Sequence, residues 1–458
     1  MPSSLKSVHL TNYYHKHSGG ISTSFNNLLA AAERHRRLVR LIVPGETEAV
    51  EDVNEFAKIY YVPAKYSPIF DKRYRLMTPM QYIPNGSIIR QILRSEMPDI
   101  IEVTDKYTLS MLGAMIRIGK FSQLNRPMLV HFSCERMDDN IASFLSKGRL
   151  AKWFARRVMG NYTIPSFDYH IANSVYTAEE FYQSVGKSEN PRRSDWFFNK
   201  CWRFFNAPRV TAAERIFVCP RGVDAVHFSP HRKSADVRRE MRELAGIPES
   251  SVILLYAGRL SPEKNIGLLP EIMKSLAGDT KRDYRLLVAG DGPQSNWLRE
   301  QSDKHALGKI IQLGHLDKEK LAEFYANADV FVHPNPKEPF GIAPLEAMAS
   351  GVPTVAPNAG GILSYASNEN AWLVEPDSES FATAIREVIE NDELRNVKIE
   401  RALETARTNT REASTDSLFA AYDKMYEDFQ RRKQLFTDME ASKRFDFAGE
   451  LLNTERGL

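Results

Sequence analysis

Residues 333–356, HPNPKEPFGIAPLEAMASGVPTVA, contain the side chains best suited to binding a polar ligand. The segment reads as the end of a strand, a loop, a short helix and the next strand. Glu338 lies in the loop, and Glu346 lies eight residues later within the helix, so the two carboxylates can address different parts of one ligand. Carboxylate oxygens only accept hydrogen bonds, which suits them to the paired hydroxyls of a ribose or a hexose.

The helix in this segment begins close to Glu338. Pro344 suits its first turn, and Gly351 suits its left-handed C-terminal cap. Amides that lack partners within the helix, those of Phe340, Gly341 and Ile342, can donate to further ligand oxygens. A favourable interaction with the helix dipole is the alternative role of the glutamates. That role does not explain Glu338, which lies between Lys337 and Pro339.

Two basic residues follow another expected strand. In GRLSPEKN, residues 258–265, Arg259 leaves the strand and Lys264 comes five residues later, before an expected helix. A guanidinium fork and a mobile ammonium at one strand end suit the spread negative charge of a diphosphate. The alternative, two solvated surface cations, stays open at this point.

Two weaker signals lie in the first half of the chain. SGGIS, residues 18–22, places Gly19 and Gly20 between a strand and a helix. Without a Cβ, they let amides approach a phosphate, although a tight turn would use the same residues. His131 lies at the end of the expected strand PMLVHFS and is a candidate sugar ligand, with a structural role as the alternative.

These segments need a scaffold that brings strand ends together. Short apolar runs alternate with helix-period stretches along the chain, which predicts parallel sheets built from βα units. The expected strands span residues 7–10, 38–43, 99–105, 127–133, 169–174, 251–258, 284–290, 309–316, 329–334, 352–357 and 371–374. Ligands bind beyond the carboxyl ends of such strands, which is where the segments described above lie.

The alternation stops once, near residues 222–250, where Pro230 and the charged run RKSADVRREMREL replace it. We place the linker and domain boundary there. The predicted fold class is α/β, with two doubly wound, Rossmann-like domains facing each other across a cleft. We expect the first domain at 1–222, the second at 223–415, and a C-terminal helix and tail at 416–458 that pack back toward the first domain.

Composition excludes several classes of protein. A chain of 458 residues with 43% hydrophobic and 26% charged residues is globular and exceeds what one core usually organises. The N-terminus has no apolar signal region, and no segment approaches the ~20 apolar residues of a membrane span. Cys134, Cys201 and Cys219 have no metal-binding spacing. We therefore expect a cytoplasmic protein without a metal site.

Charge and aromatic residues are unevenly distributed. Residues 1–220 carry 30 Lys and Arg against 20 Asp and Glu, whereas residues 221–458 carry 31 against 38. The basic first half suits an anionic lipid or membrane surface, with a solvated basic face as the alternative. Aromatic and basic residues mix at 144–160 and at 195–205, the latter within an expected insertion at 187–210. We expect the first stretch to bury its aromatic residues, and the second to bury them or to bind the inner face of a membrane peripherally.

Together these segments resemble glycosyltransferase family 4, a group of retaining GT-B glycosyltransferases. The resemblance covers roughly residues 5–430 and is most specific in EPFGIAPLEAMASGVPTVA with its E-x7-E pair. It also includes SGGIS, IANSVYTAEEF, PRGVD, AGRLSPEKN, VAGDGP and LGHLDKEKLAEFYANADVFVHP. It implies a GT-B fold and transfer of a glucose-type or mannose-type hexose from a nucleoside-diphosphate sugar to a lipid or saccharide acceptor. It implies neither a cofactor nor a nucleic-acid partner.

The resemblance assigns the donor site position by position. It implies that Arg259 and Lys264 bind the donor diphosphate. It further implies that Glu346 holds the ribose and that Glu338 holds the sugar. The other donor-binding positions that it implies are Gly19 and Gly20 from the other domain, Gly290, Gly292, Phe340, Gly341 and Ile342, with Leu313 to Leu316 beside the base.

The remaining assignments concern the reacting end of the sugar. His131 matches the strand-end histidine beside the sugar and completes a catalytic set with Arg259, Lys264 and Glu338. Glu135 and Arg136 are candidate acceptor-binding residues, for which the family offers no secure role. The sequence departs from the family pattern at two positions, since Arg221 replaces a usual Asn and Asn335 replaces a usual small serine.

The chemistry implied is cleavage of the bond between the anomeric carbon and a diphosphate. Its main need is stabilisation of negative charge on the leaving phosphate, which Arg259 and Lys264 can supply without a metal. No carboxylate is placed as a covalent nucleophile, which favours attack from the face that the diphosphate leaves. The alternatives are a Rossmann dehydrogenase, for which a GxGxxG motif is missing, a GT-B phosphorylase or other nucleotide-sugar enzyme, and a non-catalytic nucleotide-sugar-binding protein.

Overall fold

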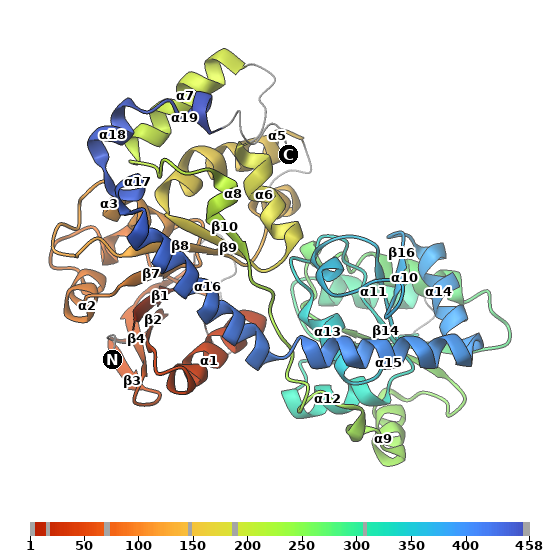
Figure 1. The fold of residues 1–458 in the computed structure, drawn as a ribbon. Coiled ribbons are helices and arrows are strands. Elements are labelled where there is room, and N and C mark those ends of the chain that lie inside the picture. The colour runs from red at the N-terminus through yellow and green to blue at the C-terminus, as the bar shows by residue number, and fades with distance from the viewer. Residues whose placement is uncertain are drawn as a thin grey trace. The chain divides into compact units, whose positions relative to one another are not determined.

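The computed structural model describes residues 5–14, 19–67, 74–144, 149–185, 191–305 and 309–451 (Figure 1). It divides into two compact units. Unit 1 comprises Met1–Cys219 and Thr415–Leu458, and unit 2 comprises Pro220–Ser414. Each unit is an α/β assembly around a largely parallel sheet, which confirms the predicted fold class.

Unit 1 contains an eight-stranded sheet of order β10-β9-β8-β7-β1-β2-β4-β3. The strands are β1 (Lys6–Leu10), β2 (Leu38–Gly45), β3 (Ala49–Asp52), β4 (Ala57–Pro63), β7 (Ile100–Val103), β8 (Met128–Ser133), β9 (Tyr169–Ala172) and β10 (Ile216–Val218). All neighbours pair in parallel except β3, which runs antiparallel to β4 at the edge. A separate antiparallel pair joins β5 (Lys65–Tyr66) to β6 (Arg75–Leu76).

Helices cover both faces of this sheet, as a parallel sheet requires. They are α1 (Gly19–Arg34), α2 (Ile88–Glu96), α3 (Ser110–Arg117), α4 (Met137–Phe144), α5 (Arg149–Val158), α6 (Val175–Val185), α7 (Pro191–Phe204) and α8 (Ala212–Arg215), with the short turns η1 (Pro79–Gln81), η2 (Met159–Thr163) and η3 (Ile164–Ser166). On one face Phe25 and Leu28 of α1 pack against β2, and on the other Leu93 of α2 and Leu112 of α3 enter the core.

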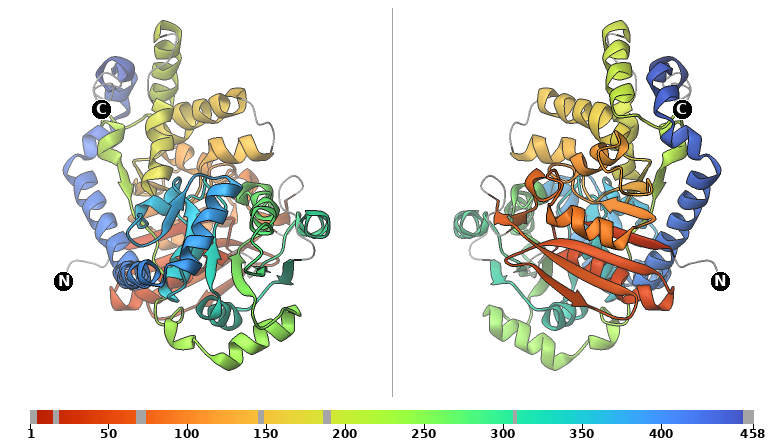
Figure 2. Two further views of the ribbon diagram at one scale, coloured as in Figure 1. Left: turned by 90° about the vertical axis from the view of Figure 1, so that its right-hand side faces the viewer. Right: turned by 90° about the vertical axis from the view of Figure 1, so that its left-hand side faces the viewer.

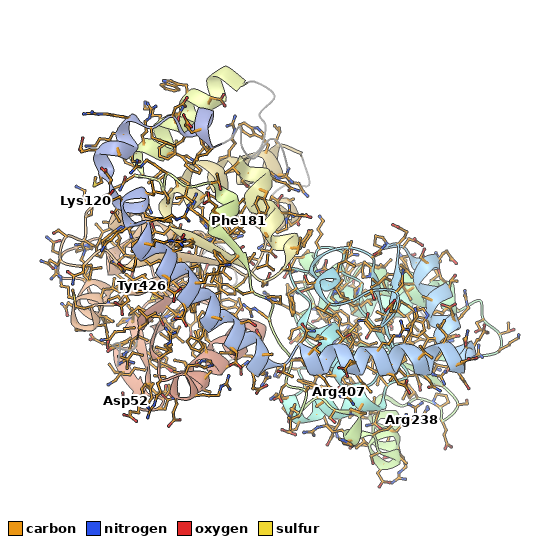
Figure 3. The ribbon with its side chains drawn as sticks, viewed as in Figure 1. Asp52, Lys120, Phe181, Arg238, Arg407 and Tyr426 are labelled. Atoms are coloured by element: carbon orange, nitrogen blue, oxygen red, sulfur yellow. The ribbon has the colours of Figure 1, made fainter. Side chains whose placement is uncertain are left out.

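The C-terminal segment groups with unit 1. It consists of α16 (Arg411–Arg431), α17 (Lys433–Thr437), α18 (Met439–Arg444) and α19 (Phe447–Glu450). From Thr415 onward α16 lies alongside the sheet of unit 1, where Phe419 and Met425 join the core (Figures 1 and 2). Tyr426, labelled in Figure 3, donates a hydrogen bond to Asp99 Oδ1 at 3.4 Å.

Unit 2 contains a six-stranded, fully parallel sheet of order β13-β12-β11-β14-β15-β16. Its strands are β11 (Val252–Ala257), β12 (Tyr284–Ala289), β13 (Ile310–Gly314), β14 (Val330–Val332), β15 (Thr354–Pro357) and β16 (Trp372–Val374). Its helices are α9 (Ala235–Ala245), α10 (Leu268–Leu276), α11 (Ser295–His305), α12 (Lys318–Asn327), α13 (Ile342–Ala349), α14 (Ser378–Glu390) and α15 (Asp392–Thr408), with short turns η4 (Pro230–Arg232), η5 (Pro262–Lys264) and η6 (Gly361–Ser364).

The linker that we expected at 222–250 is wrong in its central part, because α9 forms there and belongs to unit 2. Ser234 caps the helix by accepting from the amide of Val237, and Gly246 ends it in the left-handed conformation. Met241 anchors α9 in the core and is fully buried. We took this segment for a linker because its helix is highly charged and has only a small apolar face.

Gly222 lies where the chain enters unit 2. It lies beside Thr410, close to where the chain leaves that unit. Val223 pairs with Thr410 in an isolated parallel bridge. A Cβ at Gly222 would lie 1.9 Å from the Thr410 carbonyl oxygen, so a side chain does not fit there. The glycine of PRGVD is therefore explained by backbone packing within unit 2.

Cys134, Cys201 and Cys219 form no disulfide within the described residues. Among the described residues, no helix is long and apolar enough to cross a membrane.

Candidate active site

The strand order of unit 2 reverses between β11 and β14. Strands β12 and β13 lie on one side of β11, and strands β15 and β16 lie on the far side of β14. In open α/β sheets ligands bind in the crevice outside the carboxyl ends of the strands at such a reversal. The loops that follow β11 and β14, residues 258–267 and 333–341, both begin at this point.

Lys264 and Glu338 are joined at this reversal point by an ion pair. Lys264 ends η5, and Asn265 follows it in the left-handed conformation with φ 52°. The Lys264 Nζ lies 2.9 Å from both carboxylate oxygens of Glu338. Two residues that are 74 positions apart, and that we assigned to different parts of the donor, therefore share one contact.

Asn335 also holds the Glu338 carboxylate. Its Nδ2 donates to Glu338 Oε2 at 3.0 Å, while its Oδ1 accepts from the amide of Lys337 at 3.0 Å. Asn335 is buried. We did not predict this contact, although the departure from a small residue at this position was visible in the sequence. A serine side chain is shorter by one atom and would not reach in the same way.

The ion pair determines the charge of Glu338. Burial alone raises the pKa of this carboxyl, but the Lys264 ammonium, His333 and the hydrogen bonds from Lys264 and Asn335 together lower the pKa to about 2. His333, whose Nε2 lies 3.9 Å from Glu338, has its pKa lowered to about 4, mainly by burial. Near neutral pH the site therefore contains a carboxylate, an ammonium and a neutral imidazole.

Glu346 lies in a different electrostatic environment, on α13. Burial raises its pKa to about 7, against a weak hydrogen bond from Tyr325 at 3.4 Å and the more distant charges of Arg411 and Lys318. Those two cations are held by Asp224 of PRGVD at 2.8 Å each. A carboxyl group with so little hydrogen bonding inside the protein is well suited to a ligand diol.

Gly341 shapes the backbone between Glu338 and Glu346. Gly341 has φ 88° and comes directly before α13, so the amides of residues 340–342 lie at a helix N-terminus. The ring of Phe340 is buried against Tyr365, with ring centroids 5.2 Å apart, so only its backbone is available to a ligand. Tyr365 in turn donates a hydrogen bond to the Gly341 carbonyl oxygen.

Gly360 and Gly361, which we did not single out, support the Glu338 loop. The amide of Gly361 donates to the Glu338 carbonyl oxygen at 2.7 Å. A Cβ at Gly361 would lie 2.0 Å from the Pro339 carbonyl oxygen, and Gly360 has φ 82°. The available signal was a glycine pair shortly after the expected strand VPTVAP, a pattern like the one that drew attention to Gly19 and Gly20.

Gly290 and Gly292 allow a close approach, but to protein backbone. A Cβ at Gly290 would lie 1.9 Å from the Gly258 carbonyl oxygen, and one at Gly292 would lie 2.3 Å from the Leu260 carbonyl oxygen. The loop after β12 therefore packs directly on the loop that contains Arg259. A nucleotide contact is not needed to explain these glycines. Leu313 to Leu316, expected beside the base, span the end of β13 and the start of the next loop.

His131 does not face a ligand, which corrects our expectation. It lies inside β8, paired with Val103 and His170, and is fully buried. Its ring lies 5.3 Å from that of Phe167 and 5.9 Å from that of Phe181, labelled in Figure 3. Burial and the Lys106 charge hold its pKa well below the usual range. The strand continues to Ser133, so His131 is not at its end. Its side chain therefore points into one face of the sheet, which other side chains cover.

Gly19 and Gly20 are the first residues of α1. A Cβ at Gly19 would meet nothing within 4 Å, so packing inside unit 1 does not require a glycine there. Their assignment to the donor diphosphate involves both units and stays a prediction.

Arg136 is a structural residue, which corrects the second acceptor candidate. It is buried, and its guanidinium pairs with Asp138 at 2.9 Å while donating to Gln183 and to the Tyr176 carbonyl oxygen. Every one of these partners belongs to unit 1. Glu135, by contrast, is only partly buried and lies just beyond the carboxyl end of β8.

Known proteins with similar sequences are sugar transferases. The family described as Glycosyl transferases group 1 matches residues 237–405. A GDP-mannose-dependent alpha-(1-6)-phosphatidylinositol dimannoside mannosyltransferase of Mycobacterium tuberculosis is 28% identical over 391 residues, which cover 85% of this chain and 89% of that protein. A D-inositol 3-phosphate glycosyltransferase of Geodermatophilus obscurus is 36% identical over 231 residues, covering 48% of this chain and 50% of that protein.

Known structures show the same fold over nearly the whole chain. Sucrose-phosphate synthase from Thermosynechococcus elongatus superposes with a TM-score of 0.68 at 19% identity, covering 92% of this chain and all of that one (100%). HepE from Anabaena in complex with UDP-glucose superposes with a TM-score of 0.66 at 17% identity, with the same two coverages.

The fold and the sequence relatives together define the chain as a glycosyltransferase with the GT-B fold. Residues 237–405 match the family described as Glycosyl transferases group 1, and the motifs of the chain resemble glycosyltransferase family 4.

Proposed function

We propose that the protein transfers a hexose from a nucleoside-diphosphate sugar to a lipid-linked or saccharide acceptor, with retention of the anomeric configuration. The observation that carries this proposal is the Lys264–Glu338 pair at the strand-order reversal of unit 2, directly before the N-terminus of α13. A cation for phosphate, a carboxylate for sugar hydroxyls and oriented amides occur there together.

In the proposed complex Lys264 contacts the donor phosphate and also holds Glu338, which binds the sugar. An ammonium has three N–H donors, and two of them are directed at Glu338. The third can meet a phosphate oxygen while Glu338 accepts from the sugar hydroxyls. Arg259 and the amides of residues 340–342 add further donors, and Glu346 accepts from the ribose. This chemistry uses neither a metal ion nor a cofactor.

Retention follows in the proposal from attack by the acceptor on the face that the diphosphate leaves. The carboxylate nearest the sugar, Glu338, has its negative charge stabilised by Lys264 and Asn335, which makes it a hydroxyl acceptor rather than a nucleophile. A covalent sugar on any carboxylate of the protein would contradict this part of the proposal.

The first donor to test is GDP-mannose, because two relatives that match most of this chain are described as GDP-mannose-dependent mannosyltransferases. We expect the thermal unfolding temperature to rise with GDP and GDP-mannose more than with UDP, ADP or their glucose conjugates, since a ligand of the native state stabilises it. Lys264→Ala should abolish the rise.

The matched control is Lys274→Ala, which removes an exposed lysine of α10 in the same unit and should leave the rise intact. No rise with any nucleotide would contradict the proposal. Phosphate-dependent cleavage of a disaccharide would then favour a GT-B phosphorylase, and its absence would favour a non-catalytic protein.

Unit 1 also presents an aromatic surface suited to a membrane. We expected the first aromatic stretch to be buried, but Leu150, Trp153 and Phe154 of α5 are 81%, 58% and 57% exposed. Only the side of α5 that carries Ala155 reaches the core. Because helical period alone cannot say which side is covered, the expectation was wrong.

The second stretch divides between core and surface. On α7, Phe198 and Trp202 are buried, whereas Trp196, Phe197 and Phe204 are exposed. Residues 187–190 of the expected insertion lie outside the described residues. Basic side chains lie over the exposed rings, with Lys200 Nζ 5.0 Å from the centre of the Trp196 ring. Aromatic rings flanked by cations are typical of surfaces that bind an anionic bilayer.

We propose that these exposed residues of α5 and α7 bind an anionic membrane. The protein should float with vesicles that contain phosphatidylglycerol, and binding should weaken at high salt because the charges are exposed. Replacing Trp153, Phe154, Trp196 and Phe197 together by serine should reduce flotation at least ~10-fold, given the apolar area removed. Leu244→Ser, an equally exposed apolar residue on α9, is the control. Failure of the unaltered protein to bind anionic vesicles would contradict the proposal.

A further inference from the structure

Asn265 joins the loop after β11 to the loop after β14. It directly follows Lys264, and its Nδ2 donates to the Pro334 carbonyl oxygen at 2.9 Å. Pro334 is buried just beyond the end of β14 and directly precedes Asn335, which donates to the Glu338 carboxylate. The side chain of Asn265 therefore connects the loop that contains Lys264 to the loop that contains Glu338, by a contact that is separate from their ion pair.

These contacts form a closed ring. Asn265 donates to Pro334, Asn335 donates to Glu338 at 3.0 Å, and Glu338 pairs with Lys264 at 2.9 Å. One peptide bond joins Lys264 to Asn265 and another joins Pro334 to Asn335, which completes the ring. The two loops therefore cannot move apart without breaking the Asn265 hydrogen bond, the ion pair or both.

The turn at Asn265 does not by itself require an asparagine. Its φ of 52° lies in the left-handed region, where glycine and asparagine are favoured. Its carbonyl oxygen accepts from the amide of Leu268, and any residue could accept in the same way. A glycine would therefore fit the turn equally well. What asparagine adds is a side-chain amide that donates to Pro334.

We propose that Asn265 is a positioning residue that holds the Lys264 ammonium and the Glu338 carboxylate in the geometry that transfer requires. This inference rests on the proposed transferase function and adds a residue that acts on the reaction through Lys264, without touching the donor. A donor in its ground state is still attracted to a slightly displaced ion pair, whereas the transition state depends on the exact placement of both groups. Loss of the Asn265 contact should therefore lower turnover more than donor binding.

The kinetic test uses Asn265→Gly, which keeps the left-handed backbone and removes the hydrogen bond. We expect kcat to fall about 10-fold while the KM for the donor changes less than about 3-fold, the pattern of an interaction that matters mainly in the transition state. The measurement is release of GDP from GDP-mannose, with methyl α-D-mannopyranoside or water as the acceptor. Asn206→Gly, at another left-handed asparagine (φ 50°) in unit 1, is the matched control and should keep the normal rate.

A double variant separates positioning from a general structural role. In the Lys264→Ala background, Asn265→Gly should cost less than about 2-fold more, because Asn265 acts through the pair that is already lost. A residue that only supports the fold would multiply the two losses. Asn265→Asp keeps the size of the side chain, but its carboxylate only accepts, so it should lose at least as much as Asn265→Gly.

Hydrogen–deuterium exchange tests the ring without any ligand. The amides of residues 335–341 should exchange at least ~3-fold faster in Asn265→Gly than in the unaltered protein, because the loop opens more readily. A normal kcat, multiplied losses in the double variant or unchanged exchange would overturn the inference. If Asn265→Gly fails to fold, Asn265→Asp gives the same comparisons. No thermal response of the unaltered protein to any nucleotide would contradict the proposed function instead, and exchange would still decide whether Asn265 holds the loop.

Discussion

Lys264→Ala is expected to lower the rate of hexose transfer by about 100-fold, the usual loss when one preorganised group that stabilises transition-state charge is removed. The change removes the ammonium that contacts both oxygens of Glu338 and that we assign to the diphosphate. Glu338→Ala should have an effect of similar size, through the sugar. Initial rates with GDP-mannose and an acceptor, separated into kcat and KM, measure both.

The double variant, with both Lys264→Ala and Glu338→Ala, tests whether the two residues act together. Because the two side chains contact each other, their effects should be non-additive, and the double variant should lose much less than the ~10,000-fold product of the single losses. Asn335→Ser should give a smaller loss, since it removes only one contact to Glu338. Near-normal rates in both single variants would mean that the donor site lies elsewhere, and Lys274→Ala again serves as the control.

Asp168→Ala is expected to destabilise unit 1 by about 3–5 kcal/mol, the cost of breaking a buried ion pair. Asp168 is fully buried and accepts from Arg117, from Arg126 at 2.8 Å and from the amide of Leu129 at 2.8 Å. Burial lowers the pKa of Arg117 to about 9, and the Asp168 charge acts against that lowering. Denaturant unfolding measures the change.

The same variant should loosen the C-terminal segment. Arg117, the last residue of α3, donates to the Phe436 carbonyl oxygen at 3.0 Å and so connects α3 to α17. Limited proteolysis should therefore cut after α16 more readily in Asp168→Ala. The control is Asp416→Ala, whose pairs with Arg34 and His35 are exposed and worth about 1 kcal/mol or less. A loss below about 1 kcal/mol for Asp168→Ala would show that the network is not needed for stability.

Local patterns predicted every strand of the unit 2 sheet, but in unit 1 they missed β3, β4 and β10. The buried strands β8 and β12 are recognisable because both of their faces are covered and most of their residues are apolar. The exposed edge strand β3, AVED, has no such run and was not predicted. Helix α9 was not predicted either, because Met241 is its only fully buried side chain among many charged ones.

Candidate residues were easiest to find where they directly follow an expected strand. Arg259, Lys264 and Glu338 follow strand ends, and every strand end of one parallel sheet lies at the same edge. His131 and Arg136 were misread for a common reason. Histidine and arginine are common in active sites, but both of these side chains are buried and contact other parts of unit 1, so both have structural roles.

The sequence by itself determined the alternation of strands and helices, the resemblance to a family, and the loops that contain the candidate donor-binding residues. These features depend on residues that are near one another in the chain, and periodicity and turn residues record them directly. Only the tertiary structure decided that Lys264 pairs with Glu338, that α5 exposes its aromatic residues and that Arg136 donates to Gln183. Such contacts join residues tens of positions apart, and they depend on which faces other elements cover, which no local pattern contains.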